Sequence, residues 1–220
     1  MFKFIIVGDS SVGKSCILKR FETNEFTEAT PATVGVEYVS KRINIEDHQI
    51  SLQIWDTAGQ ENLFSLVSSY FRNSCGILLV FDISRRSTFE HLTKWFTYVD
   101  DLANPNAKVI IIGNKSDLES KREVKSLEAE IFATQRKCAY IETSARNGKN
   151  VNELFFKMCQ DVYADLKAGR CEATQDGAMG IKQGELPSSW AKPKPQVATS
   201  IPMMQAVSQP ENREQSCCSK

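Results

Sequence analysis

The chain has 220 residues and a formal net charge of zero, since 27 lysines and arginines balance 27 aspartates and glutamates. A hydrophobic fraction of 41% is enough for a buried core, and the balanced charge gives no reason to expect binding to nucleic acid or to anionic lipid. The longest apolar run, Cys75–Phe81, is far too short to cross a membrane, and Phe2 excludes N-myristoylation.

The first predicted elements are a strand, a helix and a hairpin. Lys3–Val7 is apolar on both faces, as buried parallel strands are, and Cys16–Phe21 is expected to be helical. Arg42–Glu46 and Ile50–Trp55 alternate apolar and polar residues around the turn Asp47–His48. This alternation predicts an antiparallel hairpin.

Strands and helices alternate further along the chain. Cys75–Asp82 and Lys108–Gly113 are two more apolar runs expected as buried strands. Between them, apolar residues recur at helical spacing behind a capping-box signature at Ser87–Glu90, and a second helical pattern follows Asn150. Alternating strands and helices predict a mostly parallel sheet with helices on both faces. The periodic residues are Phe89, Leu92, Phe96, Val99 and Ala103 in the first pattern, and Val151, Leu154, Phe155, Met158, Val162 and Leu166 in the second.

The composition changes after Ala168, so we expect a folded domain over residues 1–168. Residues 169–216 hold five of the seven prolines together with Gly, Ser and Gln and few aliphatic residues. Such a segment buries too little surface to offset its ordering entropy, so we expect a flexible tail with a root-mean-square span of roughly 40 Å. Residues 217–220 form the end of the chain, Cys217-Cys218-Ser-Lys.

Five other cysteines and two histidines show no metal-ligand spacing. None of these cysteines stands in a C-x-x-C motif, so we expect reduced thiols, without a disulfide framework or a zinc site. These cysteines are Cys16, Cys75, Cys138, Cys159 and Cys171.

The segment Gly8–Ser15, GDSSVGKS, fits the phosphate-binding pattern G-x-x-x-x-G-K-[ST] between the first strand and the first helix. Its glycines allow backbone N–H groups to turn toward phosphates, and the helix N-terminus adds partial positive charge. We expect the Lys14 ammonium to reach the β- and γ-phosphates and the Ser15 hydroxyl to bind Mg²⁺. This loop alone does not distinguish ATP from GTP.

A second motif, GNKSD, follows the third apolar run and predicts the base. The Asp117 carboxylate can accept both the N1–H and the N2 amino protons of guanine, whereas adenine offers no such pair. Lys115 can lie along the purine, and Asn114 can tie this loop to the phosphate loop. Their position at the carboxyl end of a strand is where open α/β sheets bind ligands. By itself N-K-x-D is a weak pattern that a solvated turn also produces.

A third motif, WDTAGQE, ends the predicted hairpin. Asp56 stands where a carboxylate would hold Mg²⁺ through water, and Gly59 has no side chain to block its N–H from a γ-phosphate. With T-V-G-V-E-Y before it and E-T-S-A-R after it, five motifs now stand in order over residues 3 to about 167. In this order the chain resembles a small GTPase of the Ras superfamily, and within it the Rab branch. Such proteins have a mostly parallel six-stranded sheet with helices on both faces.

The resemblance implies a role for each matching position. Gln60 would orient the attacking water, Phe26 would flank the guanine, and the Thr33 hydroxyl would complete the Mg²⁺ shell. Tyr38, Trp55 and Tyr70 match the aromatic trio on the Rab effector face, although ordinary packing explains Trp55 equally well. The expected nucleotide contacts are Ser11, Val12, Gly13, Lys14, Ser15, Cys16, Phe26, Thr33, Gly59, Asn114, Lys115, Asp117, Ser144, Ala145 and Arg146.

Two departures from the family pattern bear on regulation. Asn62-Leu63 stands where relatives carry E-R-F or E-S-F after the glutamine, which leaves the choice of regulators open. Arg146 replaces a lysine, which should change little, because the backbone makes the contact there. No arginine is expected to act in cis, so we predict slow unaided GTP hydrolysis.

Cys217 and Cys218 resemble the double-cysteine ends of Rab proteins that receive two geranylgeranyl groups. Because one lipid chain binds membranes only marginally, two would give durable attachment. The implied partners are an exchange factor, a GTPase-activating protein, a dissociation inhibitor, a prenylation escort and effectors, on a monomer that cycles between cytosol and vesicles. SRRSTFEHLTKW and GNKSDLESKREV resemble Rabs of the Golgi, endoplasmic reticulum and early or recycling endosomes.

Two alternative functions remain. A P-loop phosphotransferase would share the phosphate loop, but the guanine motif and the lack of an arginine-rich lid disfavour it. A nucleotide-dependent scaffold that has lost hydrolysis would explain Asn62-Leu63, but the retained Gln60, Thr33 and Asp56 disfavour that interpretation.

Overall fold

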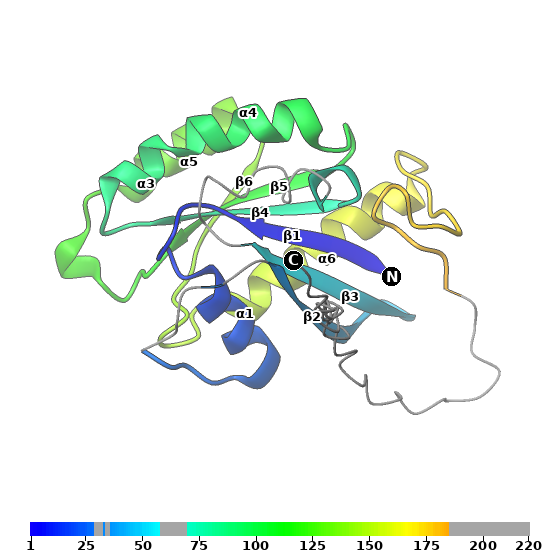
Figure 1. Ribbon diagram of the computed structural model, residues 1–220, viewed down its shortest axis with the longest axis horizontal. Coiled ribbons are helices and arrows are strands. Elements are labelled where there is room, and N and C mark those ends of the chain that lie inside the picture. The colour runs from blue at the N-terminus through cyan, green and yellow to red at the C-terminus, as the bar shows by residue number, and fades with distance from the viewer. Residues whose placement is uncertain (29–32, 34–35, 58–69, 185–220) are drawn as a thin grey trace, which may run out of the picture. The chain divides into compact units, whose positions relative to one another are not determined.

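The computed structural model describes residues 1–28, 33, 36–57 and 70–184. One six-stranded sheet runs through the molecule in the order β2-β3-β1-β4-β5-β6 (Figure 1). Only the β2–β3 pair is antiparallel, so the predicted mostly parallel sheet is confirmed. The strands are β1 (Phe2–Val7), β2 (Val36–Ile45), β3 (His48–Thr57), β4 (Gly76–Asp82), β5 (Lys108–Asn114) and β6 (Ala139–Glu142).

Helices cover both faces of the sheet, as predicted (Figure 1). On one face, α1 (Lys14–Thr23) and α6 (Val151–Lys167) meet through the stacked rings of Phe21 and Phe155, whose centroids lie 4.0 Å apart. The other face carries α3 (Arg86–Glu90), α4 (Leu92–Leu102) and α5 (Ser126–Gln135), and a short 3₁₀ turn, Glu119–Lys121, precedes α5. Two apolar clusters therefore sandwich the central strands, which are buried on both sides.

Two local predictions need correction. The hairpin strands are longer than expected and turn at Glu46–Asp47, because Glu46 takes the positive φ of 50° that the tight turn needs. The capping box at Ser87–Glu90 is wrong. The helix starts at Arg86 without a side-chain cap, and the Thr88 hydroxyl instead donates to the carbonyl of Arg85.

The domain boundary predicted at Ala168 is also wrong, since the folded unit extends to Gly184. Ile181, only 2% exposed, forms an antiparallel bridge with Phe2 at the start of β1, and the N–H of Lys3 donates to the Gly180 carbonyl. The composition misled the prediction because all five tail prolines lie beyond Gly184. We call residues 171–182 the clasp.

Candidate functional site

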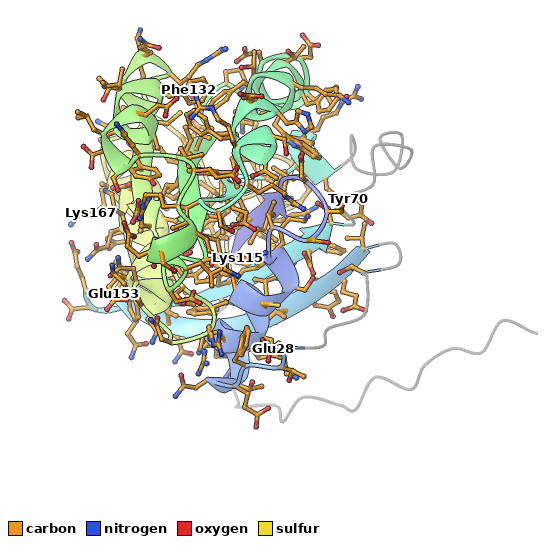
Figure 2. All side chains as sticks on the ribbon, turned by 90° about the vertical axis from the view of Figure 1, so that its left-hand side faces the viewer. Glu28, Tyr70, Lys115, Phe132, Glu153 and Lys167 are labelled. Atoms are coloured by element: carbon orange, nitrogen blue, oxygen red, sulfur yellow. The ribbon has the colours of Figure 1, made fainter. Side chains whose placement is uncertain are left out.

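The predicted motifs meet at the carboxyl edge of the sheet, onto which Figure 2 looks. Strand β1 ends before Gly8, β4 ends at Asp82, and β5 ends at Asn114. Lys115, labelled near the centre of that view, follows directly after β5. Because parallel strands end together, three loops that are distant in the sequence become neighbours here.

The phosphate-loop motif leads into the N-terminus of α1. Gly13 occupies the N-cap position with a φ of 95°, and a Cβ there would lie 2.5 Å from the Asn114 amide nitrogen, so glycine is required on both grounds. No side chain caps this helix, and its first turn holds no acidic residue. The first N–H groups therefore have no side-chain acceptor and are suited to bind an anion.

Lys14 is nearly buried, with 6% exposure, and its ammonium stays inside the loop. Its Nζ donates to the carbonyls of Gly8 and Asp9, both at 2.8 Å. Burial lowers the pKa of Lys14 to about 8, against the opposing attraction of Asp56 and Asp9. A buried cation with only neutral carbonyl acceptors is well placed to receive an anionic ligand.

Ser15, Thr33 and Asp56 come together although they lie on three different segments. The two hydroxyl oxygens are 2.7 Å apart, Ser15 Oγ donates to Asp56 Oδ2, and Thr33 Oγ1 lies 3.5 Å from the same oxygen. The other carboxylate oxygen, Oδ1, is buried and has no hydrogen-bond partner among the described residues. Burial raises the pKa of Asp56, and the Ser15 hydroxyl and the Lys14 ammonium oppose that rise.

This cluster fits Mg²⁺. All its donor atoms are hard oxygens, the preference of that ion, and the buried Oδ1 of Asp56 lacks the partner that a metal-bound water would provide. Within the described residues no cluster of three or more His, Cys, Asp or Glu side chains suits a metal. Two hydroxyls and one carboxylate are instead the donor set that the sequence predicted.

The GNKSD loop is bound to the phosphate loop. Asn114 is 1% exposed, and its Nδ2 donates to the Val12 carbonyl at 2.7 Å. The Thr143 hydroxyl donates to Asn114 Oδ1 at 3.2 Å, which fixes the orientation of the amide. The tie proposed from the sequence is thus present as a buried hydrogen bond.

Asp117 is held by the third loop of this edge. The Ser144 hydroxyl donates to Asp117 Oδ1 at 2.6 Å, while Oδ2 has no hydrogen-bond donor among the residues that the structure describes. A carboxylate fixed in this way can accept hydrogen bonds from a ligand without first losing conformational freedom. The predicted base-binding residues of two separate motifs therefore act as one unit.

Lys115 makes two contacts that its motif alone did not reveal. Its Nζ donates to the Ser11 carbonyl at 2.9 Å and pairs with Asp82 Oδ2 at 2.7 Å. Asp82 is 3% exposed and belongs to none of the predicted nucleotide-binding motifs. Its position at the end of a buried strand, on the same edge as Asn114, was the available signal.

Arg20 on α1 is a second residue that the sequence analysis missed. Its Nε donates to the Ala145 carbonyl at 2.8 Å, and its Nη2 donates to the Arg146 carbonyl at 2.6 Å. The backbone predicted to contact the base is thereby tied to the helix that follows the phosphate loop. A single half-buried arginine on an amphipathic helix carries no sequence signal for this role.

The remaining predicted residues are partly placed. Phe26 is half-buried and packs against the core beyond α1, and Cys16 is half-buried in the first turn of that helix. Gly59 and Gln60 lie outside the described residues, as do Cys217 and Cys218. The structure thus brings together the predicted phosphate, metal and base residues that it describes.

A network of hydrogen bonds around Glu142 holds the first residue of the E-T-S-A-R loop in place. Arg122 donates to both carboxylate oxygens, at 2.8 and 2.9 Å, and Ser126 and Tyr140 donate to Oε1. Burial alone would raise the pKa of Glu142, but these hydrogen bonds hold it below its usual range. These hydrogen bonds fix Glu142, which directly precedes the loop that carries Ser144 and Ala145, and so restrain the start of that loop.

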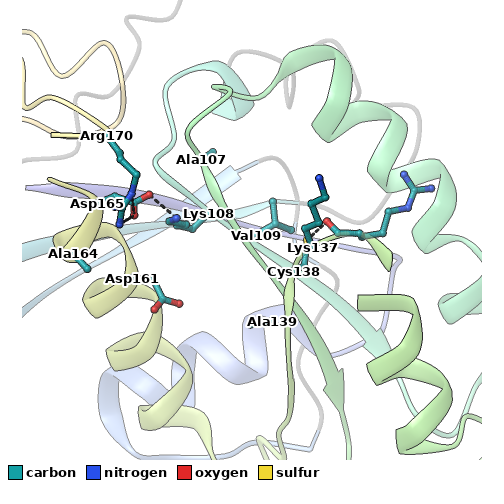
Figure 3. Close-up of a pocket in the computed structure, with 11 residues that line it drawn as sticks. Ala107, Lys108, Val109, Lys137, Cys138, Ala139, Asp161, Ala164, Asp165 and Arg170 are labelled. Carbon is teal, nitrogen blue, oxygen red and sulfur yellow. Dashed lines mark hydrogen bonds and ion pairs between the residues drawn. The ribbon is translucent and has the colours of Figure 1, made fainter. Parts of the chain in front are cut away.

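A pocket of about 520 Å³ lies at the opposite, amino edge of β5, lined by Lys108, Asp165 and Arg170 among others (Figure 3). Asp165 accepts from both cations, at 2.5 Å from Lys108 and 2.6 Å from Arg170. None of the predicted site residues lines it. Its most buried charge, Asp165, is already neutralised, so this pocket is a weaker candidate for a ligand site than the carboxyl edge.

Among the described residues no helix is long and apolar enough to span a bilayer.

Comparison with models of protein families gives a match that covers most of the folded unit. The model of the Ras family matches residues 3–164. The matched range runs from the second residue of β1 through most of α6, and it contains all the loops of the carboxyl edge described above.

Proposed function

This chain belongs to the Ras family of small GTPases, and from that premise we propose that its carboxyl-edge site binds Mg²⁺ with GTP or GDP and hydrolyses GTP slowly. The observation that carries the proposal is the buried Asn114–Val12 hydrogen bond, which joins a guanine-selecting loop to a phosphate loop. A single ligand that contacts both loops must have a guanine base at one end and phosphates at the other.

The side chains of this site divide the work of binding. We assign the phosphates to the α1 N-terminus and Lys14, and the base edge to Asp117, oriented by Ser144. The protein would hold Mg²⁺ through Ser15, Thr33 and, through water, Asp56. When bound, the ion would neutralise negative charge on the phosphates.

For hydrolysis we assign the positioning of the attacking water to Gln60. No arginine is proposed to act on the γ-phosphate in cis, so the unaided rate should be slow, and an activating partner should raise it. Thr33 also offers the basis of a switch, because its contacts in the site would depend on the γ-phosphate.

We further propose that the switch is of the Rab type and works on vesicles of the Golgi or endosomes, anchored by lipids on Cys217 and Cys218. Tyr38, Trp55 and Tyr70 support this proposal because they form a continuous row, with ring centroids 5.1 and 4.9 Å apart. Tyr38 is 44% exposed, so the row reaches the surface, where effectors would bind.

Single-turnover hydrolysis of GTP by the purified full chain, with ATP as competitor, tests the enzymatic part. We expect slow release of phosphate from GTP and no inhibition by ATP at up to about a tenfold excess. Effective competition by ATP would favour the phosphotransferase, and binding of GTP without any hydrolysis would favour the scaffold.

The anchoring part needs a separate measurement. The full chain carrying an N-terminal fluorescent tag should locate to internal membranes, and the Cys217→Ser, Cys218→Ser double variant should remain in the cytosol. The Ser216→Ala, Ser219→Ala variant controls for changes in the neighbouring residues. Membrane localisation of the double-cysteine variant would contradict the lipid anchor.

A further inference from the structure

Three side chains from the segment between β4 and the middle of α4 contact the beginning of the phosphate loop. The indole Nε1 of Trp95 donates to Asp9 Oδ1 at 2.9 Å, and Nδ1 of His91 lies 2.6 Å from Oδ2 of the same carboxylate. Arg85 Nη2 donates to the Ser10 carbonyl at 2.7 Å. All three stand in the segment SRRSTFEHLTKW, for which the sequence predicted no contact with the phosphate loop, and we call them the corner triad.

The three contacts differ in how strongly they should hold the loop, because the three side chains differ in burial. Trp95 is 8% exposed and packs in the apolar cluster between α4 and the sheet, so its indole is fixed in place. The His91 side chain is 50% exposed, and an exposed pair of this kind contributes little. Arg85 lies between them in exposure, but its Nε is buried without a partner among the described residues, so the bond to Ser10 offsets only part of its desolvation. Trp95 is therefore the main anchor.

Asp9 is consequently held from two sides. Its carbonyl accepts from Lys14 inside the loop, while its carboxylate accepts from Trp95 and His91 outside. The side chain of Asp9 is 18% exposed and bonds to Trp95 and His91, while Lys14 Nζ donates to the backbone oxygen of Asp9. The triad thus restrains the backbone of the phosphate loop without occupying the position where an anion would bind.

We propose that Trp95, assisted by Arg85 and His91, positions the phosphate loop and thereby sets how long a bound nucleotide stays. The proposal rests on the proposed function of the site. A loop whose N–H groups are already arranged loses less conformational entropy when it binds phosphate than a loop that must first be ordered. Releasing Asp9 should therefore speed nucleotide dissociation without altering the choice of base, which depends on the other end of the site.

The test measures release of a fluorescent GDP from the full chain, with magnesium present. Trp95→Phe keeps an aromatic ring but removes the indole N–H, and we expect release about fivefold faster, because water can partly replace the bond to the partly exposed Asp9 carboxylate. Arg85→Gln should act in the same direction, and His91→Leu should have the smallest effect. The preference for GDP over ADP should not change in any of the three.

Two control variants separate positioning from loss of stability. Phe96→Leu removes part of the apolar cluster that also contains Trp95 but changes no contact of Asp9. Thr97→Val removes an exposed hydroxyl whose hydrogen bond is to the Thr93 carbonyl within α4. We expect both to release GDP at the wild-type rate, while Phe96→Leu lowers the melting temperature at least as much as Trp95→Phe.

A double-mutant cycle with Asp9→Ala completes the test. If Trp95 acts through Asp9, Trp95→Phe adds no further acceleration in the Asp9→Ala background. Any of three results would overturn the proposal. Trp95→Phe could release GDP at the wild-type rate, Phe96→Leu could speed release as much as Trp95→Phe, or the effects of Trp95→Phe and Asp9→Ala could be additive. Failure of the wild-type chain to bind GDP would instead refute the proposed function, before any variant is compared.

Discussion

The two ends of the same strands are built on opposite principles. At the carboxyl edge, buried polar groups are left incompletely paired: Asp56 Oδ1 has no partner among the described residues, and Lys14 meets only carbonyls. At the amino edge, the clasp completes the hydrogen bonding of β1, since Lys3 donates to Gly180 and Lys182 donates to Met1.

We therefore call the carboxyl edge the binding edge and the amino edge, which the clasp covers, the closing edge. Unpaired buried groups cost folding free energy, so they persist where a ligand can satisfy them. The amino edge instead buries apolar groups and thiols, including Cys75, Cys171 and Ile181. Substitutions at the carboxyl edge should therefore change ligand binding, and substitutions at the amino edge should change stability.

The largest effect is expected for Asp117→Ala. Loss of the carboxylate leaves the guanine N1–H and amino group without an acceptor, so affinity for GTP should fall on the order of 10³-fold and the preference over ATP should nearly vanish. Competitive binding of fluorescent nucleotides measures both quantities. Asp161→Ala, which removes an exposed partner of Lys157, should leave both unchanged. If Asp117→Ala still preferred GTP over ATP, the assignment of Asp117 as the residue that recognises guanine would be wrong.

Gly180→Ala tests the closing edge. Gly180 has a φ of 75°, and an added Cβ would lie 2.3 Å from the Cys75 nitrogen, so the clasp must shift. We expect a loss of about 3 kcal/mol in the free energy of unfolding, measured in urea, with unchanged GDP release.

Gly169→Ala is the matched control for that variant. Gly169 has a similar φ of 67°, but a Cβ there would meet nothing within 4 Å. Only the backbone penalty of about 1 kcal/mol should remain. Equal destabilisation by the two variants would show that the clasp does not pack against Cys75 in solution.

Arg20→Gln should speed GDP release about tenfold, a smaller effect on the binding edge. The substitution removes the guanidinium that holds the carbonyls of Ala145 and Arg146, so the loop that orients Asp117 through Ser144 becomes looser. Stopped-flow release of a fluorescent GDP measures the change. Lys19→Gln, which alters only an exposed bond to Thr27, should behave as wild type. An unchanged rate in Arg20→Gln would limit this residue to a structural role.

The smallest expected effect is a dependence of stability on pH. The folded pKa of Glu142 is lowered, so its contribution to stability is complete above the ordinary value of 4.5 and is lost as the pH falls through the folded value. Melting temperatures measured from about pH 6 downward should therefore fall less steeply for Glu142→Gln than for wild type. Parallel curves would show that the Arg122 network contributes no pH-dependent stability.

The binding edge could be predicted from the sequence because its chemistry needs particular residues at fixed spacing. Gly13, Lys14 and Asp117 each belong to a motif whose physical task is local. Residues that act across the fold, such as Arg20, Asp82 and Trp95, could not be found, because their partners lie on segments distant in the sequence.

The closing edge was missed for a related reason. A bridge formed by Ile181 with Phe2 is too short to produce a periodic pattern, and the proline-rich composition beyond Gly184 concealed it. Helix α5 was also not predicted, since Leu127 and Ile131 are exposed, at 66% and 51%, and blur its apolar face. Strand β6 has only four half-buried residues, Ala139–Glu142, and was expected only from the resemblance to six-stranded small GTPases.

Amide hydrogen exchange of the full chain, with and without a nucleotide and magnesium, tests the central claim most directly. We expect GDP to slow exchange at Gly13–Cys16 and Asn114–Asp117 and to leave the clasp unchanged, whereas ADP should slow exchange in neither region. Equal protection by ADP, or protection by GDP only at the amino edge, would contradict a guanine-nucleotide site at the carboxyl ends of the strands.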